Sequence, residues 1–348
     1  MRLAPSFIFA TLVLLLLTAC GGKKSEPLHQ EHLMVFGTIV DISVYGGDEA
    51  VVYNALQQIE DDLDYLHQAL HAWEAGSLGR TNQLIAATGT FTAPPSVLPL
   101  IEQSQQIYRA SDGLFNPAIG HLVALWGFHG DDPQRPPPAE EISALLAAAP
   151  SMDDLAINGV RLHNRNPAVR LDLGAIAKGY AVDRAVETLH SAGLHHVIVN
   201  AGGDLRASGR RGDRPWRIGI RDPRGPGILA SIEIVGDESL FTSGDYERFF
   251  EVDGVRYHHI LDPRSGQPAR GLTSVTVLGN DGAAADAAAT ALLIAGPHEW
   301  PRIAAALGFD KVMVVDSSGA IQATPAMAER ITLESSAAQA TLERVPLP

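Results

Sequence analysis

A carboxylate and a hydroxyl stand four residues apart in a segment that is otherwise almost all alanine. Residues 284–291 read AADAAATA, so Asp286 and Thr290 would share one face of a helix. Oxygen ligands of this kind suit Mg²⁺, which takes few protein ligands and completes its shell with water and phosphate oxygens. An Asp near a helix N-terminus is also common for structural reasons alone. The spacing therefore indicates either a magnesium site or a helix cap.

A second segment, residues 171–180 (LDLGAIAKGY), combines a helix start with a lysine. A strand is expected to end at Asp172 and a helix to begin near Ala175. Such a junction exposes unpaired backbone N–H groups that favour an anion, and Lys178 lies one turn into the helix. The alternative is that Asp172 caps the helix and Lys178 is a solvated side chain.

Three further loops carry glycine together with polar side chains. Residues 199–205 (VNAGGDL) predict either a close approach of backbone to a ligand or a tight turn between strands. Residues 241–248 (FTSGDYER) could present hydroxyls and an arginine to a phosphate, or form a β-turn. Residues 258–266 (HHILDPRSG) bring His259 near Asp262, which suits acid–base chemistry or a simple paired turn.

A competing metal site is offered by His67 and His71, which stand at positions i and i+4 of an expected helix and could bind zinc. The same stretch of helix also carries Glu60 and Asp64. A solvated polar face is therefore favoured over a zinc pair.

The N-terminus carries an apolar run, Phe7–Leu17, that is short for a membrane span but suits a secretion signal. It ends in Leu17-Thr18-Ala19-Cys20, which resembles the lipobox of bacterial lipoproteins and implies a lipid on Cys20. The alternative is an ordinary signal peptide with an incidental cysteine. The expected division is a signal peptide over 1–19, a tether over 20–32, one domain over 33–327 and a C-terminal tail over 328–348.

Composition narrows the class of protein. With 46% hydrophobic and 19% charged residues, the 348-residue chain is not disordered as a whole. The net charge of −14 argues against nucleic-acid binding, which needs a basic face. A single cysteine excludes both an intramolecular disulfide framework and a thiolate zinc cluster.

The hydrophobic pattern mixes helices and strands without regular βαβ alternation, which favours an α+β fold. Neither G-x-G-x-x-G nor G-x-x-x-x-G-K-[ST] occurs in a setting that would support a Rossmann or P-loop site. The expected strands are Val35–Tyr45 and Lys311–Val315, and the expected helices are Asp48–His71, Pro95–Ala110, a short one ending at Ala149, Ala175–Ala192, Ala283–Ala295 and His298–Leu307.

The combination of motifs resembles the FAD:protein FMN transferase family (ApbE-type flavin transferases). The family's motifs occur in order: Gly37-Thr38, Trp73–Leu78, Asp112–Gly120, Leu125–Phe128, and then the five segments described above. The resemblance implies an α+β fold of mixed sheets with flanking helices, in which FAD lies in a cleft between two lobes. The lipoprotein signal also fits, because many members are exported lipoproteins.

The resemblance implies a Mg²⁺-dependent enzyme that transfers FMN from its substrate FAD to a Thr or Ser hydroxyl of a target flavoprotein, with release of AMP. Two alternatives stay open: a periplasmic FAD pyrophosphatase that uses water, and a lipid-anchored FAD-binding protein without catalysis. The acceptor would be an exported or membrane-bound flavoprotein, and no nucleic acid is expected as a partner. The location would be the bacterial cell envelope, with the protein anchored through Cys20 and facing the periplasm.

The resemblance also assigns residues. It implies that the metal is held by the Ala175 carbonyl, Asp286 and Thr290, and that His259 or Asp262 is the base for the acceptor hydroxyl. The sequence departs from the family at Phe36, where methionine is frequent, and at Asn116, where an F-D-x-T segment would carry a carboxylate. The residues implied to contact FAD are Phe36, Trp73, Leu114, Phe115, Asn116, Asp172, Lys178, His259 and Ile260.

Overall fold

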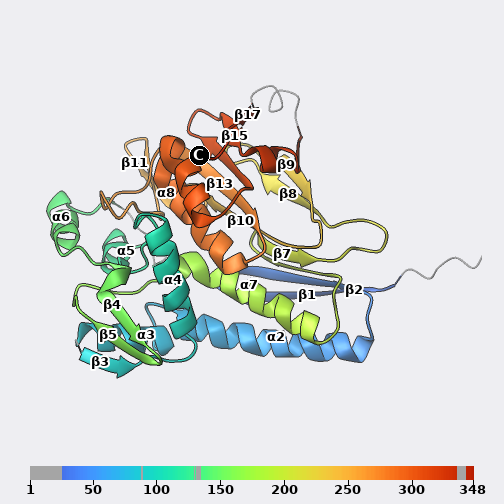
Figure 1. Ribbon diagram of the computed structural model, residues 1–348, viewed down its shortest axis with the longest axis horizontal. Helices are drawn as coiled ribbons and strands as arrows, with labels where there is room; N and C mark the ends of the chain where they lie inside the picture. Colours follow the sequence, from blue (N-terminus) through green and yellow to red (C-terminus); the bar gives the residue numbers. More distant parts are fainter. Residues whose placement is uncertain (1–25, 88, 129, 131–134, 335–341) are drawn as a thin grey trace, which may run out of the picture.

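A nine-stranded sheet in the order β1-β2-β6-β7-β10-β13-β14-β15-β17 runs through the centre of the molecule in the computed structural model (Figure 1). Neighbouring strands are antiparallel except β15 and β17. The structure describes residues 26–87, 89–128, 130, 135–334 and 342–348. The strands are β1 (Leu28–Val35), β2 (Thr38–Tyr45), β6 (Val197–Ala201), β7 (Asp204–Ser208), β10 (Asp237–Gly244), β13 (Leu272–Gly279), β14 (Val312–Asp316), β15 (Ile321–Ala323) and β17 (Leu342–Arg344).

Three smaller sheets surround the large one. Their strand orders are β3-β5-β4, β16-β9-β8 and β11-β12. The strands are β3 (Gly89–Thr92), β4 (Leu155–Asn158), β5 (Arg161–Asn164), β8 (Arg217–Arg221), β9 (Ile228–Glu233), β11 (Phe249–Val252), β12 (Val255–His258) and β16 (Ile331–Leu333).

Helices α2 (Glu49–Leu70), α7 (Gly174–Ser191) and α8 (Gly282–Leu307) cover one face of the large sheet (Figure 1). The opposite face packs on the sheet β16-β9-β8 through a second apolar cluster. The middle strands of the sheet are therefore buried on both faces, while side chains of the β1–β2 edge, such as Met34 and Ile39, remain exposed. The remaining helices are α3 (Ser77–Ala86), α4 (Leu98–Ala110), α5 (Gly120–Trp126), α6 (Ala139–Ala147), α9 (Pro325–Ala328) and the 3₁₀ turn η1 (Met152–Asp154).

The predicted α+β class is confirmed, and the helices with strong periodicity lie where the sequence predicts them. In α2 the buried Leu56, Ile59, Leu63 and Leu66 recur every three or four residues and form the stripe that faces the sheet. The two helices expected over 283–307 are confirmed. They share the label α8, but Gly296, with a φ of 75° and a ψ of −178°, breaks the helical path between them.

Three expected boundaries differ from the structure. The strand expected over Val35–Tyr45 is the end of one strand and the whole of the next, because Phe36 (φ 55°) and Gly37 (φ 70°) form a two-residue hairpin turn. The tether expected over 20–32 is shorter, since β1 already begins at Leu28 and pairs with β2. The tail expected over 328–348 contributes β16 and β17 to sheets. In the second and third cases, main-chain pairing adds to a sheet a stretch that the sequence pattern does not mark as a strand.

The signal peptide expected over 1–19 and the candidate lipidation residue Cys20 lie outside the described residues. Within the described part of the chain, no helix has both the length and the apolar character needed to cross a bilayer.

Candidate functional site

Helices α7 and α8 cross at a pair of glycines, and this crossing builds the site. A Cβ on Gly179 would lie 2.2 Å from the carbonyl oxygen of Gly282, so only glycine permits the approach. The Gly179 N–H donates to Asp286 Oδ2 at 3.0 Å. In a regular helix this same N–H points at the carbonyl of Ala175. The Gly179 N–H is therefore directed at both Asp286 and the Ala175 carbonyl, which are two of the three implied metal ligands.

Asp286 is a buried carboxylate, with 5% of its surface exposed. Burial raises its pKa to about 7, and the nearby charge of Lys178 acts in the opposite direction. Thr290 follows one turn later on α8, and its Oγ1 lies 3.1 Å from Oγ of Ser243 on β10. The helical spacing predicted from the sequence is thus realised on a face that points at β10.

Lys178 forms an ion pair with Asp204, a residue that the sequence analysis did not single out. Asp204 is buried, and its Oδ1 also accepts from the Thr242 N–H at 2.9 Å. Burial alone would lower the pKa of Lys178, but the charges of Asp204 and Asp286 outweigh it and the pKa is raised. Lys178 is therefore a permanent cation that is paired with Asp204 and further stabilised by the charge of Asp286, while about 34% of its side chain stays exposed.

The glycines of residues 199–205 form the tight turn that was one of the two predictions for them. Gly202 (φ 68°) and Gly203 (φ 107°) connect β6 to β7, and Asn200 Oδ1 accepts from the Gly203 N–H at 2.8 Å. The turn places Asp204 at the first position of β7, facing Lys178. The sequence signal that could have indicated Asp204 as a site residue is its position directly after this glycine turn. The β-turn considered for residues 243–245 lies slightly later in the chain, because Ser243 and Gly244 end strand β10 and the turn follows at Asp245 and Tyr246.

A third buried carboxylate, Asp183, joins α7 to the start of α8. Its Oδ2 accepts from the Gly282 N–H at 2.8 Å and from the Ala283 N–H at 3.1 Å. Its Oδ1 accepts from Arg206 Nη1 at 2.9 Å, and burial raises its pKa to about 6. Asp281 caps α8 by accepting from the Ala284 N–H at 2.8 Å.

His259 is the better placed of the two candidate bases. The main-chain N–H of His259 donates to the Arg248 carbonyl at 3.1 Å, and Nδ1 of its imidazole ring lies 3.3 Å from the same oxygen. Burial, followed by the charge of Arg248, lowers its pKa well below the usual value, and Lys178 contributes in the same direction. The imidazole is therefore neutral at neutral pH.

Asp262 is engaged within its own loop. Its Oδ1 accepts from the Arg264 backbone N–H at 2.8 Å, and its Oδ2 accepts from Arg264 Nη2 at 2.7 Å. Ile260 is buried, and its N–H donates to Nδ1 of His258 at 3.3 Å. In the loop 258–266, Asp262 stabilises the conformation of the loop, and His259 remains as the candidate base.

The residues implied to lie along the flavin are aromatic or buried. The Phe36 ring meets His67 edge-on at 5.4 Å, and His67 meets His71 at 5.9 Å. His71 Nδ1 accepts from the Trp73 N–H at 3.3 Å. The described residues contain no group of three or more His, Cys, Asp or Glu that could hold a metal, so the histidine pair belongs to an aromatic cluster. The Arg170 guanidinium lies 4.3 Å above the Trp73 ring.

The segment 114–116 packs into the core. Leu114 and Phe115 are buried, while Asn116 donates to the Pro150 carbonyl at 2.9 Å and accepts from the Ala118 N–H at 3.1 Å. Contacts from this segment to a ligand would therefore come from the main chain.

Asp172 directly precedes Leu173, the N-cap residue of α7, and its carboxylate accepts from the Gly174 N–H, the first of the helix, at 2.9 Å. This is the arrangement considered as the alternative for Asp172. An additional contact of Asp172 with adenosine stays a prediction.

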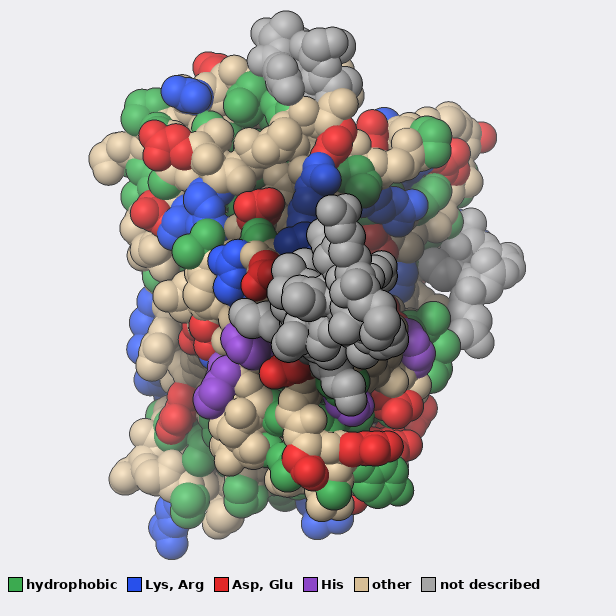
Figure 2. Space-filling view, turned by 90° about the vertical axis from the view of Figure 1, so that its right-hand side faces the viewer, with side chains coloured by type: hydrophobic (Ala, Val, Ile, Leu, Met, Phe, Trp, Pro, Cys, Tyr) green, Lys and Arg blue, Asp and Glu red, His purple; other side chains and the backbone are tan. Residues whose placement is uncertain are grey.

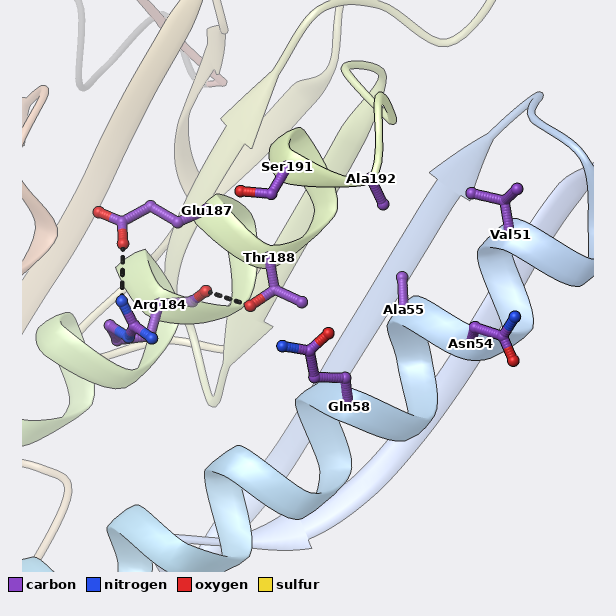
Figure 3. Close-up of a pocket in the computed structure, with 9 residues that line it drawn as sticks. All are labelled: Val51, Asn54, Ala55, Gln58, Arg184, Glu187, Thr188, Ser191 and Ala192. Atoms are coloured by element: carbon purple, nitrogen blue, oxygen red, sulfur yellow. Dashed lines mark hydrogen bonds and ion pairs between the residues drawn. The ribbon is translucent and has the colours of Figure 1, made fainter.

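A cavity in the described chain does not coincide with this chemistry. It is a groove of about 460 Å³ between α2 and α7, shown in Figure 3. Its lining is small or polar, and Arg184 is already paired with Glu187 at 3.3 Å. No predicted site residue lines it, so the carboxylate–lysine cluster, rather than a cavity, locates the candidate site.

The arrangement of sheets and helices places the protein in a structural class of flavin transferases. It resembles the ApbE protein of Thermotoga maritima with a TM-score of 0.80 and 32% identity over 87% of this chain and 99% of that one. It resembles the Pseudomonas stutzeri flavinyl transferase ApbE, in the apo form, with a TM-score of 0.77 and 32% identity over 88% and 97% of the two chains.

Sequence comparison gives the same result. The family model named ApbE matches residues 36–313, and the chain belongs to the ApbE family. The FAD:protein FMN transferase of Treponema pallidum is 33% identical over 91% of this chain and 94% of its own length. The FAD:protein FMN transferase of Rhodobacter capsulatus is 42% identical over 95% of this chain, which spans 64% of that relative.

Proposed function

We propose that this chain is a flavin transferase that moves FMN from FAD to a Thr or Ser hydroxyl of a flavoprotein, with release of AMP. The names of the relatives support flavin transfer from FAD to protein. The observation that carries the proposal is the buried Asp286 beside the Lys178–Asp204 pair at the α7–α8 crossing. This cluster supplies both a metal-binding carboxylate and a fixed cation for a pyrophosphate.

The residues present fit Mg²⁺. In the described chain Asp286 accepts one hydrogen bond, from Gly179, and burial disfavours its charge. A divalent cation would remove that penalty, and carboxylate, hydroxyl and carbonyl oxygens are the donors that Mg²⁺ prefers. We propose that Asp286, Thr290 and the Ala175 carbonyl hold the metal, which would neutralise charge on the pyrophosphate oxygens.

The protein's own groups have distinct tasks in the proposed transfer. Lys178 binds a phosphate oxygen, and Asp204 keeps its ammonium in place. His259 Nδ1 faces a carbonyl that can only accept, so Nδ1 carries the proton and Nε2 is basic. Nε2 takes the acceptor's hydroxyl proton as that oxygen bonds to the FMN phosphorus, and the bond from phosphorus to the AMP oxygen breaks.

One incubation tests the proposal. The chain from residue 20 onward is mixed with FAD, Mg²⁺ and an acceptor domain, and AMP and covalently bound flavin fluorescence are measured. AMP together with a fluorescent acceptor is the expected result. AMP with free FMN in its place would identify a pyrophosphatase, and tight FAD binding without either product would identify a binding protein.

We further propose that the chain is anchored in the bacterial cell envelope through a lipid on Cys20, facing the periplasm. The support is the lipobox-like sequence of residues 17–20. Mass spectrometry of the N-terminal peptide from membranes should find a lipid-modified Cys20 as the first residue. Cys20→Ser should leave the chain unmodified, and an unmodified cysteine in the parent chain would contradict the anchor.

A further inference from the structure

An arginine-rich loop projects from the end of the molecule at which the described chain begins. In this loop, residues 210–214, Arg210, Arg211 and Arg214 are exposed and form no ion pair within the described part of the chain. Arg211 and Arg214 exchange main-chain hydrogen bonds of 2.9 and 3.3 Å, so the loop has a defined shape. Asp213 is its one acidic residue, which leaves a net charge of +2 in a chain whose total is −14.

Contacts place this arginine loop beside the first described residues. A Cβ on Gly212 would lie 3.0 Å from the Tyr45 hydroxyl. The Tyr45 N–H donates to the His196 carbonyl at 2.8 Å, and the neighbouring Gly46 N–H donates to the Pro27 carbonyl at 2.8 Å. The Arg210 N–H in turn donates to His196 Nδ1 at 3.0 Å. Figure 2 looks onto this end of the molecule, where basic side chains, interspersed with acidic ones, lie across the middle and upper part of the face.

The candidate active site lies at the opposite ends of the same strands. Strand β7 runs from Asp204, beside Lys178, to Ser208, and only Gly209 lies between Ser208 and the arginine loop. At about 3.3 Å per residue, this strand separates the two by roughly 15 Å. The β1–β2 hairpin is oriented in the same way, because its turn contacts the turn of β6–β7: a Cβ on Gly202 would meet Thr38 Oγ1 at 2.4 Å.

The short segment before β1 restricts where a lipid anchor can be. Residues 21–25 separate Cys20 from Glu26, so a fully extended chain spans on the order of 20 Å between them. A lipid on Cys20 would therefore keep this end of the molecule near the bilayer surface. Exposed arginines that lie close to the bilayer surface are attracted by anionic headgroups, and their guanidinium groups can bind the headgroup phosphates.

We propose that the arginine loop binds anionic phospholipid headgroups and turns this end of the domain toward the bilayer, so that the FAD site faces away from it. The proposal rests on the anchor at Cys20 and not on the flavin-transfer chemistry. Its ligand is a lipid surface, since three guanidinium groups that form no ion pair in the described chain lie on one exposed loop and suit many headgroups at once. The Arg210 guanidinium also donates to the Asp213 carbonyl at 2.5 Å, which keeps it on this loop.

The test uses the chain from residue 20 onward with Cys20→Ser, which carries no lipid and keeps every described residue. Its binding to vesicles of phosphatidylcholine alone is compared with binding to vesicles that also contain phosphatidylglycerol, by sedimentation at low salt. The parent should bind only the anionic vesicles. Replacing Arg210, Arg211 and Arg214 by Gln should weaken that binding by about 10-fold or more, and added salt should weaken the parent's binding similarly.

A matched control removes the same charge elsewhere. Arg80, Arg135 and Arg161 are exposed, form no ion pair in the described chain and lie on other elements. Their replacement by Gln should leave vesicle binding within about 2-fold of the parent. Equal losses in both triple variants, or equal binding to neutral and anionic vesicles, would overturn the proposal.

The outcome is separable from the functions proposed above. The vesicle assay involves neither FAD nor a lipid on Cys20, so failure of flavin transfer or of lipidation leaves its result readable. Conversely, the arginine-loop variant should release AMP at the parent's rate in solution. No vesicle binding by a parent chain that is active in solution would refute the headgroup contact alone.

Discussion

Asp286 on α8 accepts a hydrogen bond from the main-chain N–H of Gly179 on α7, at 3.0 Å. A backbone donor has no rotamers, so the orientation of this carboxylate is fixed by the helix crossing itself. Its Oδ1 accepts no hydrogen bond from the residues that the structure describes. One oxygen is thus used for positioning, and the other is available to a cation.

Asp286→Asn should separate stability from function. The amide can keep the bond from Gly179 but lacks the charge, so Mg²⁺-dependent AMP release should fall by a factor on the order of 100. Because burial raises the carboxyl's pKa to about 7, the ionised form destabilises the metal-free fold. The variant should therefore melt at a higher temperature than the parent at pH 8, in EDTA. Unchanged activity would contradict the metal assignment.

Metal affinity should depend on pH. A carboxyl with a pKa of about 7 must lose its proton before it binds Mg²⁺, so affinity should fall as pH drops through 7, up to about 10-fold per unit. The acid limb of AMP release should then move to lower pH as Mg²⁺ is increased. Titrations followed by Mg²⁺-induced change in melting temperature provide the check. If the acid limb of AMP release does not move with Mg²⁺ concentration, that limb arises from the titration of a group other than Asp286.

Asp204→Asn should expose the dependence of Lys178 on its partner. The amide oxygen can still accept from the Thr242 N–H, but the ion pair is lost and burial then lowers the lysine's pKa. The alkaline limb of FAD binding should move to lower pH, with affinity about 10-fold weaker at pH 9. Fluorescence titration of FAD measures both. Lys178→Arg, which retains a charge at all these pH values, should show no alkaline limb.

Asp183→Ala should loosen α8 from α7. It removes two N–H contacts to α8 and the ion pair with Arg206, so the free energy of unfolding should fall by about 3 kcal/mol. The matched control is Asp281→Ala, which removes the exposed cap of the same helix and should cost about 1 kcal/mol. Urea unfolding gives both values. Mg²⁺ affinity should fall in Asp183→Ala alone. Equal losses of stability and of Mg²⁺ affinity in the two variants would show that Asp183 acts only as a helix cap.

Gly179→Ala should separate the two helices. Its Cβ would lie 2.2 Å from the Gly282 carbonyl, which is backbone and cannot move aside, so we expect a loss of about 2–3 kcal/mol or more. Gly174→Ala is the control at the exposed start of the same helix, where the nearest atom is the Asp172 carboxylate at 3.2 Å. That change should stay within about 1 kcal/mol. Similar melting temperatures for the two variants would contradict the tight crossing.

Features that depend on spacing along one helix could be predicted from the sequence. The stripe of α2 and the pairing of Asp286 with Thr290 follow from the helical repeat. The polar strand β1 could not be predicted from the sequence. Its segment LHQEHLMV lacks the alternation of a half-buried strand, and the strand is held in place by pairing with β2.

The missed site residues are those whose partners lie far away in the chain. Asp204 is 26 residues from Lys178, and Asp183 is 99 residues from Gly282. A single sequence contains no signal for such distances. The N-x-G-G-D motif could have given the turn before Asp204, but not the lysine that it faces.

The Lys178–Asp204–Asp286 cluster has a consequence for the order in which ligands bind. With all three groups ionised, their charges sum to −1, and the pyrophosphate of FAD would bring two further negative charges to the same place. A divalent cation bound to this cluster would reverse the sign of its net charge and so favour the anion. FAD and Mg²⁺ should therefore bind with positive cooperativity, and thermodynamic reciprocity requires each to tighten the other by the same factor.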